Sequence, residues 1–211
     1  MVQVKKAEKK EAILKSAYRL FKRKGYVATT TVQIAAGARV SESNVYAYFE
    51  SKFDILFSLF EPWIRERIER LEIRVSSEPD SRAKLRVLLT ALWREIPYDD
   101  NGFSNNMMQA LSTLAGRDKY DPKLLQWVKQ RIEAMILTAV PRKWHAELTK
   151  GDLGRVLVMA QDGFVMHVHL GRSSPCSEAM IELFCDLILG TKASVPHELP
   201  TALKREQVSV L

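Results

Sequence analysis

The sequence contains little cysteine and no long apolar run. Its two cysteines, Cys176 and Cys185, are too few for a disulfide scaffold and are typical of a chain kept in a reducing compartment. No segment reaches the roughly 18 apolar residues that a membrane-spanning helix needs. Residues 1–15 are too polar for the apolar core of a secretory signal. We therefore expect a cytoplasmic protein.

Patterns of common enzymes and metal sites are also missing. The sequence contains no phosphate-binding glycine loop and no Ser-His-Asp pattern. His167 and His169 come closest to a metal motif, but a spacing of two residues points their rings about 200° apart on a helix. Two ligands of one ion would stand three or four residues apart. We expect no metal, no cofactor and no catalytic residue.

What the sequence does contain is typical of a globular protein. Apolar residues make up 46% and charged residues 27% of its 211 residues, which excludes a largely disordered chain. This length fits one domain, or a large domain with a small one attached. No alternating strand pattern of useful length occurs, and nearly every segment has helical periodicity. We predict an all-α fold of about nine helices.

The net charge of +7 is confined to one end of the chain. Residues 1–52 contain 11 Lys and Arg against four acids, whereas residues 53–211 contain 21 of each sign. Such an asymmetry favours a contact between this end and a nucleic acid or an acidic membrane. A solvated basic helix without a partner is the alternative.

A helix-turn-helix outline follows the basic first helix, which should end at Gly25. Thr30 begins a capping box, which predicts a second helix over about 31–38. Ser41 is placed to open a third helix over about 42–48. Two short helices joined by a turn of about three residues are typical of proteins whose second helix enters the DNA major groove.

The remaining segments predict a helical body. A long helix should begin at Ser51, with a kink at Pro62 because proline removes a backbone hydrogen bond. Five further helical runs cover about 81–96, 103–114, 122–140, 152–170 and 177–189. Residues 191–211 contain two prolines and are expected to be a loosely ordered tail.

The identities of residues 13–56 add a second signal. The run Val45-Tyr46-Ala47-Tyr48-Phe49-Glu50-Ser51-Lys52 closes this segment, and Ile34-Ala35 and Val40-Ser41 precede it at fixed spacing. This combination resembles the N-terminal domain of the TetR/AcrR transcriptional repressors. The resemblance implies a three-helix DNA-binding head in residues 1–52, with the helix-turn-helix at about Thr30–Phe49.

The same resemblance implies which residues contact DNA. These are residues of the second and third helices, their turn and the start of the fourth helix: Thr30, Thr31, Arg39, Ser41, Glu42, Ser43, Asn44, Tyr46, Tyr48 and Lys52. Three of them have structural alternatives. Ser41 is equally explained as a helix cap, and Tyr48 is equally placed to pack on the first helix. Glu42 could accept from a cytosine amine, but a role as partner of the helix dipole is favoured.

The turn departs from the family pattern at one position. Members commonly have Ala-Gly-Val-Ser, whereas this chain has Ala38-Arg39-Val40-Ser41. If the turn requires a left-handed residue, Arg39 costs about 1 kcal/mol relative to glycine. We expect a cation near the DNA phosphates to offset that cost. The third helix contains no Lys or Arg, so the common arginine–guanine contact is not available from it.

For residues 53–190 the resemblance implies a domain that binds a small molecule and forms a homodimer through the last two long helices. Candidates for the binding pocket are large or polar residues of the middle helices: Trp63, Trp93, Phe103, Asn105, Met108, Gln109, Trp127 and Phe164. Gln161 is a further candidate. Candidates for the dimer interface are Val156, Met159, Gly163, His167, Ile181, Phe184 and Ile188.

The leading hypothesis is a repressor that a small molecule releases from a palindromic operator, with Pro62 as a hinge. An enzyme is a second possibility, with Asp162 and His167 or His169 as the acid–base residues. A membrane-surface protein using the basic first helix is a third, although it would leave the helix-turn-helix unexplained.

Overall fold

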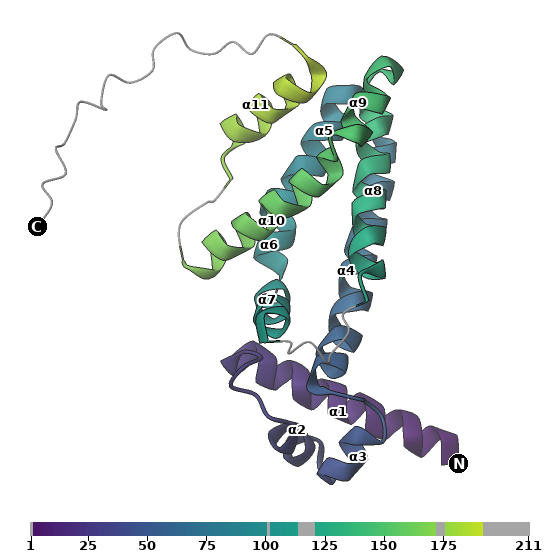
Figure 1. Cartoon of the computed structure of the whole chain (residues 1–211), viewed down its shortest axis with the longest axis vertical. Coiled ribbons are helices and arrows are strands. Elements are labelled where there is room, and N and C mark those ends of the chain that lie inside the picture. Colours follow the sequence, from purple (N-terminus) through teal and green to yellow (C-terminus); the bar gives the residue numbers. More distant parts are fainter. Residues whose placement is uncertain (1, 101, 114–120, 172–175, 192–211) are drawn as a thin grey trace, which may run out of the picture.

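The computed structural model describes residues 2–100, 102–113, 121–171 and 176–191, and within these ranges the chain is helical, without strands (Figure 1). The tail predicted for 191–211 lies outside them, apart from its first residue. The helices in chain order are α1 (Val2–Lys24), α2 (Thr31–Ala38), α3 (Glu42–Tyr46), α4 (Lys52–Ser77), α5 (Ser81–Thr90), α6 (Ile96–Asp99), α7 (Phe103–Thr113), α8 (Lys123–Ala139), α9 (His145–Lys150), α10 (Leu153–His169) and α11 (Glu178–Leu189). No helix in the described ranges is long and apolar enough to cross a membrane.

The all-α prediction is confirmed, and the differences in helix boundaries have local causes. The helix expected to end before Pro97 continues to the end of α6 through a π-helical segment, Ala91–Glu95. Because the N–H of Ile96 bonds to the carbonyl of Ala91, five residues back, the helix is wider just before Pro97. Helix α9 was not expected at all.

The molecule has a head and a body, joined by the long helix α4 (Figure 1). The head consists of α1, α2 and α3, and its core is formed by buried side chains such as Ile13, Ile34 and Val45. The body has its own larger core, drawn from α4, α5, α8, α10 and α11. Helix α4 continues through Pro62 and runs beside α8 in the body.

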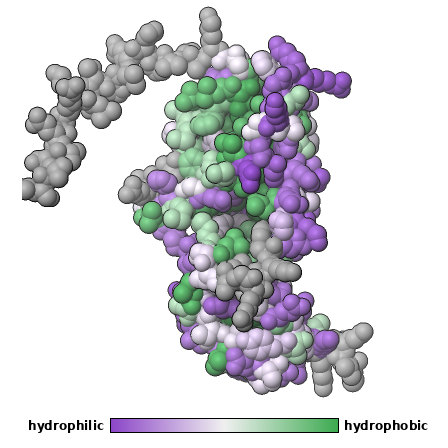
Figure 2. Space-filling view, viewed as in Figure 1, coloured by the Kyte–Doolittle hydropathy of each residue, from purple (hydrophilic) through white to green (hydrophobic). Residues whose placement is uncertain are grey.

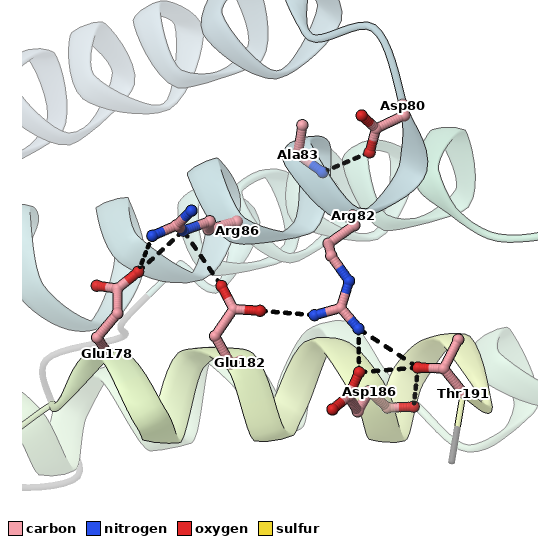
Figure 3. A network of polar contacts seen from close by, with 8 residues as sticks. All are labelled: Asp80, Arg82, Ala83, Arg86, Glu178, Glu182, Asp186 and Thr191. Carbon is pink, nitrogen blue, oxygen red and sulfur yellow. Dashed lines mark hydrogen bonds and ion pairs between the residues drawn. The ribbon is translucent and has the colours of Figure 1, made fainter. Parts of the chain in front are cut away.

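Two arginines of α5 help to hold α11 on the body (Figure 3). Arg82 pairs with Glu182 and Asp186, and Arg86 pairs with Glu178 and with Glu182. Two side chains of α11, Ile181 and Cys185, are fully buried in the core of the body. The face of α11 that carries Met180, Leu183 and Leu187 is left exposed.

Candidate functional site

Helices α1 and α2 of the head pack closely at one point. The hydroxyl of Ser16 on α1 donates to the carbonyl of Ile34 on α2 at 2.9 Å, and both residues are buried. A Cβ atom at Gly37 would overlap that hydroxyl. Glycine is therefore required there for close approach of two helices. The sequence contained this glycine, but nothing local to it indicated the contact with residue 16.

Helix caps fix the ends of α2 and α3. Thr30 and Gln33 form the predicted capping box of α2, with the backbone N–H of Gln33 donating to the Thr30 hydroxyl at 3.3 Å. Ser41 is the cap of α3, since its hydroxyl accepts from the backbone N–H of Asn44 at 3.3 Å and from the Asn44 side-chain amide at 2.8 Å. The capping role considered for Ser41 is confirmed, and the amide oxygen of Asn44 is left available for a base.

The carboxylate of Glu42 joins the two helices of the motif. It accepts from the hydroxyl of Thr31 at 2.7 Å, and that hydroxyl lies 3.3 Å from the hydroxyl of Tyr46. All three groups are near the exposed surface of the head. Glu42 therefore has a partner that neither of the roles considered for it, cytosine acceptor or dipole partner, included. Tyr48, by contrast, is half-buried against the core of the head.

Arg39 ends α2 in the left-handed conformation, with φ 58° and ψ 41°. The predicted left-handed turn is confirmed at the residue where the family commonly has glycine. The side chain of Arg39 is exposed beside the motif. Non-glycine residues adopt this conformation at a cost of about 1 kcal/mol.

Lys52 supports the loop before α2 as well as standing at the start of α4. Its ammonium donates to the carbonyls of Tyr26 at 2.9 Å and Thr29 at 2.8 Å, and it lies 4.1 Å from the centre of the Tyr26 ring. Burial, with a smaller contribution from Lys24, lowers the pKa of Lys52. An ammonium has three donors, so one is not used by these two carbonyls. Thr30, Thr31, Tyr46 and Lys52 line one shallow hollow on the head.

The sequence of this head matches a known protein family. The model of bacterial regulatory proteins of the tetR family matches residues 13–59. The head belongs to the TetR family. Among curated relatives, the fatty acid metabolism regulator protein of Bacillus subtilis is 29% identical over 89 residues, which are 42% of this chain and 46% of that protein. The regulator HbdR of Aromatoleum is 46% identical over 50 residues, which are 24% of this chain and 22% of that protein.

The similarity in sequence does not extend to whole proteins, because the matches span 22% to 46% of the curated relatives' length. The similarity in fold extends further. The regulator FadR of Bacillus subtilis, solved in complex with stearoyl-CoA, superposes with a TM-score of 0.55 over 85% of this chain and 97% of its own, at 17% sequence identity. At this identity the superposition establishes the fold of the body. Residues 13–59 thus match the helix-turn-helix head of bacterial regulatory proteins of the tetR family, and the body shares the fold of the FadR structure.

Behind the TetR-type head, the body contains a cavity of about 180 Å³ that is open to solvent on one side. It lies between α4, α7, α8 and α10. Nine apolar residues line it: Phe60, Ile64, Met107, Met108, Leu111, Leu124, Leu125, Val128 and Val158. Its polar lining consists of Ser104, Gln161 and Asp162. The composition is typical of a small-molecule site, which is mainly apolar with few polar groups.

Met108 and Gln161 are the predicted pocket residues that line this cavity, and the other candidates lie elsewhere. Trp93 is fully buried in the body core against Phe164 and Phe184. Trp63 and Phe103 pack on each other, with ring centroids 5.3 Å apart. Trp127 stacks on the guanidinium groups of Arg65 and Arg131. Asn105 hydrogen-bonds to His169, and Gln109 to the backbone of Val27.

None of the five aromatic candidates, Trp63, Trp93, Phe103, Trp127 and Phe164, lines this cavity. Large rings bury more apolar surface than other side chains and usually fill a core. The walls of the cavity are made instead by Met, Leu and Val residues, which a pattern search cannot distinguish from ordinary core. Asp162 was considered only as an acid–base residue, yet it is one of the three polar residues in the cavity wall.

Helix α7 has the cavity on one side and the TetR-type head on the other. Phe103, Met107 and Ala110 are buried in the core of the head, although they come from the body. Asn106 donates to the carbonyl of Phe21 at 3.4 Å, and Gln109 accepts from the N–H of Val27 at 3.3 Å. Met107 belongs to the cavity wall as well. One helix therefore contacts both places where function is expected.

Apolar residues form an exposed stripe on α10 and α11 (Figure 2). On α10, Val156 and Met159 are exposed, and so are Gly163 and His167 further along the same face. On α11 the predicted face was wrong, because Ile181 is fully buried in its own chain and Phe184 and Ile188 pack against the same core. The exposed residues are Met180, Leu183 and Leu187. The apolar residues of α11 occupy both faces, so periodicity alone did not identify the outer one.

The described residues contain no group of three or more His, Cys, Asp or Glu side chains able to hold a metal ion. His169 hydrogen-bonds to Asn105 at 3.1 Å, and His167 lies on the exposed stripe.

Proposed function

We propose that the protein is a homodimeric cytoplasmic repressor that a small molecule releases from a palindromic DNA operator. Residues 1–52 would bind DNA, and residues 53–190 would bind the effector and form the dimer. The observation that carries this proposal is the position of α7, which packs in the core of the head and lines the apolar cavity. A change in the cavity thus has a direct route to the head.

DNA affinity and sequence reading are divided between different residues in this proposal. The basic side chains of α1 would supply contacts to phosphates that are independent of sequence. In α3, Ser43 and the amide oxygen of Asn44 would reach base edges, while Tyr46 and Thr31 would bond to phosphate. Arg39 and the third donor of Lys52 would add phosphate contacts on either side of the motif.

Two heads are needed because the half-sites of a palindrome lie about 34–36 Å apart on one face of DNA. The exposed stripe on α10 and α11 would pair with the same stripe of a second chain. We expect Leu187→Glu and Met159→Glu each to convert the dimer to monomer in sedimentation velocity. The matched control is Ile73→Glu, since Ile73 is equally exposed on α4 but lies off the stripe. Dimers that survive both stripe variants would exclude this interface.

The effector would occupy the cavity with an apolar body. The structural neighbour FadR was solved with stearoyl-CoA, and this chain is proposed to share the principle of an amphipathic effector. The cavity measures about 180 Å³, close to the engineered cavity of about 150 Å³ that binds benzene. A compact apolar group therefore fits the cavity as it stands.

Two helices would carry the response to the head. Helix α7 contacts both the cavity and the head, and α4 does the same, with Phe60 and Ile64 in the cavity wall and Ile55 and Leu56 in the head core. Pro62 lies between the two cavity residues of α4, which supports its proposed role as a hinge. A Pro62→Ala variant with an unchanged effector response would exclude that hinge.

The test of the whole proposal is a titration of labelled duplex DNA carrying the palindrome from the protein's own promoter, followed by fluorescence anisotropy. We expect binding in the nanomolar range typical of specific recognition at physiological salt. Scrambled duplex should bind at least about 1,000-fold more weakly. Equal affinity for both duplexes would overturn the proposed operator recognition.

A further inference from the structure

The wall of the cavity contains an amide without a hydrogen-bond partner. Gln161 of α10 is only 7% exposed and lines the cavity. Its side chain makes no hydrogen bond with any other residue in the described ranges, and its polar atoms are not among the atoms fully cut off from solvent. The amide is therefore available to a molecule that occupies the cavity.

The next residue, Asp162, places a carboxyl group in the same wall. It has no ion pair or hydrogen bond with the described residues. Asp162 is open to solvent where it lines the cavity, and partial burial of its carboxyl group raises its pKa to about 6, so the carboxyl is still mainly ionised at pH 7.5. The cavity therefore contains a negative charge without a counter-ion.

Nearby cations do not compensate for this charge. A groove that shares Leu125, Val158 and Asp162 with the cavity is also lined by Lys129 and Arg155. Both already interact with another carboxylate, because Asp152 lies 2.7 Å from the ammonium of Lys129 and 3.7 Å from the guanidinium of Arg155. The uncompensated charge is that of Asp162.

We propose that the cavity binds a compact apolar molecule that carries a protonated amine, with the carboxylate of Asp162 and the amide oxygen of Gln161 as its acceptors. This inference rests on the proposed function, in which the cavity is the effector site. The apolar walls take a body about the size of a benzene ring. An ammonium provides three donors, enough for both acceptors and the solvent at the mouth.

The sign of the ligand charge follows from electrostatics. An ammonium beside a partly desolvated carboxylate gains a charge-assisted hydrogen bond and supplies the missing counter-ion. A ligand with its own carboxylate would place a second negative charge next to Asp162, which disfavours binding. A neutral hydroxyl would gain a hydrogen bond without the ionic contribution and should bind with intermediate affinity.

The experiment compares benzylamine, benzyl alcohol and benzoate, which have the same ring and differ in the charge of the attached group. Binding to the full-length protein without DNA is measured at pH 7.5 by calorimetric titration. We expect benzylamine to bind at least about tenfold more tightly than benzyl alcohol, the least that a charge-assisted hydrogen bond should provide. Benzoate should bind most weakly.

Variants identify the residue responsible. Asp162→Asn should abolish the preference for benzylamine, while Asp121→Asn, a change to an exposed carboxylate just before α8, should retain it. Thermal unfolding confirms that each variant is folded. Equal binding of the three compounds, tightest binding of benzoate, no binding, or a preference that persists in Asp162→Asn would each overturn the proposal.

Failure of the proposed function would look different. The same compounds are added to the complex of the protein with operator DNA. If benzylamine binds through Asp162 but leaves the DNA complex intact at saturation, the ligand class stands and the proposed release is wrong. If benzylamine also releases the DNA, both the ligand class and the proposed release from the operator are supported.

Discussion

The side-chain oxygen of Gln109 accepts a hydrogen bond from the backbone N–H of Val27 at 3.3 Å, linking residues 82 positions apart. The same oxygen would lie 3.1 Å from a Cβ atom at Gly25, whose φ of 80° favours glycine. The loop that leads into the helix-turn-helix is thus held directly by α7. This contact makes Gln109 a positioning residue for the head.

We expect Gln109→Leu to weaken the effector response and to leave effector affinity unchanged. The hydrogen bond to Val27 is lost, but Gln109 is not part of the cavity wall. Effector concentrations that release half of the DNA from the wild type should release less from the variant. Ser112→Ala on the exposed side of the same helix is the control. A normal response in Gln109→Leu would show that α7 does not act through this contact.

Arg39→Gly should have two separate effects. The free energy of unfolding should rise by about 1 kcal/mol, because glycine adopts the left-handed conformation without strain. The plot of log K against log salt for DNA binding should become shallower by about one, because one phosphate contact is lost. Arg39→Ala keeps the strain and removes the charge, so it should show the second effect alone. An unchanged salt slope in both variants would exclude the phosphate contact.

Gly37→Ala should destabilise the head by about 1–3 kcal/mol, the usual cost of overpacking. The added methyl group overlaps the hydroxyl of Ser16, which is fixed by its hydrogen bond to Ile34. In a Ser16→Ala background the nearest atom is the Cβ of residue 16, at 3.4 Å, and the cost should fall. Urea unfolding of the two single variants and the double variant measures this coupling. Additive effects would contradict the proposed contact.

The raised pKa of Asp162 predicts a pH dependence of stability. The folded chain keeps the proton up to about pH 6, whereas the unfolded chain releases it near pH 4. The folded state therefore binds more protons between these values, and the contribution of Asp162 to stability falls as pH rises through this window. The charged groups that line the adjoining groove are Lys129, Asp152 and Arg155, and the pKa of Asp152 is lowered by its hydrogen bond with Lys129.

Asp162→Asn removes this titration and isolates it from the other carboxyl groups. The variant should resemble the wild type at pH 4 and have a higher melting temperature at pH 7.5. Asp100, whose pKa is also raised by burial, contributes in the same direction but is present in both proteins and cancels. A difference in melting temperature that does not change with pH would contradict the assignment.

Local signals determined the head, and the sequence was sufficient to predict it. The caps at Thr30 and Ser41 and the turn at Arg39 depend on residues within four positions of each other, and all three are confirmed. The partners of Lys52 and Glu42 could not be predicted in the same way. Lys52 bonds to carbonyls 23 and 26 residues away, and Thr31 reaches Glu42 from the other helix.

In the body, the periodicity of apolar residues did not predict which helix face is buried or which residues line the cavity. A stripe predicts that a helix is amphipathic, but α11 has apolar residues on two faces, and only packing on α5 selects Ile181 and Cys185 as the inner ones. The cavity is a further case, because a wall of Leu, Val and Met has the same pattern as a filled core. A cavity differs from a filled core only in the space left between side chains of several helices, and this space cannot be predicted from any single residue.

Met107 stands in the cavity wall and in the core of the head at the same time. A substitution there changes two environments at once, so natural variation at this position is restricted by both. Val158 and the exposed Leu125 line the cavity without belonging to the head core, and carry no such double constraint. Under the proposed function, variants that acquire a new effector are therefore expected to change first at positions 125 and 158, and to keep methionine at 107.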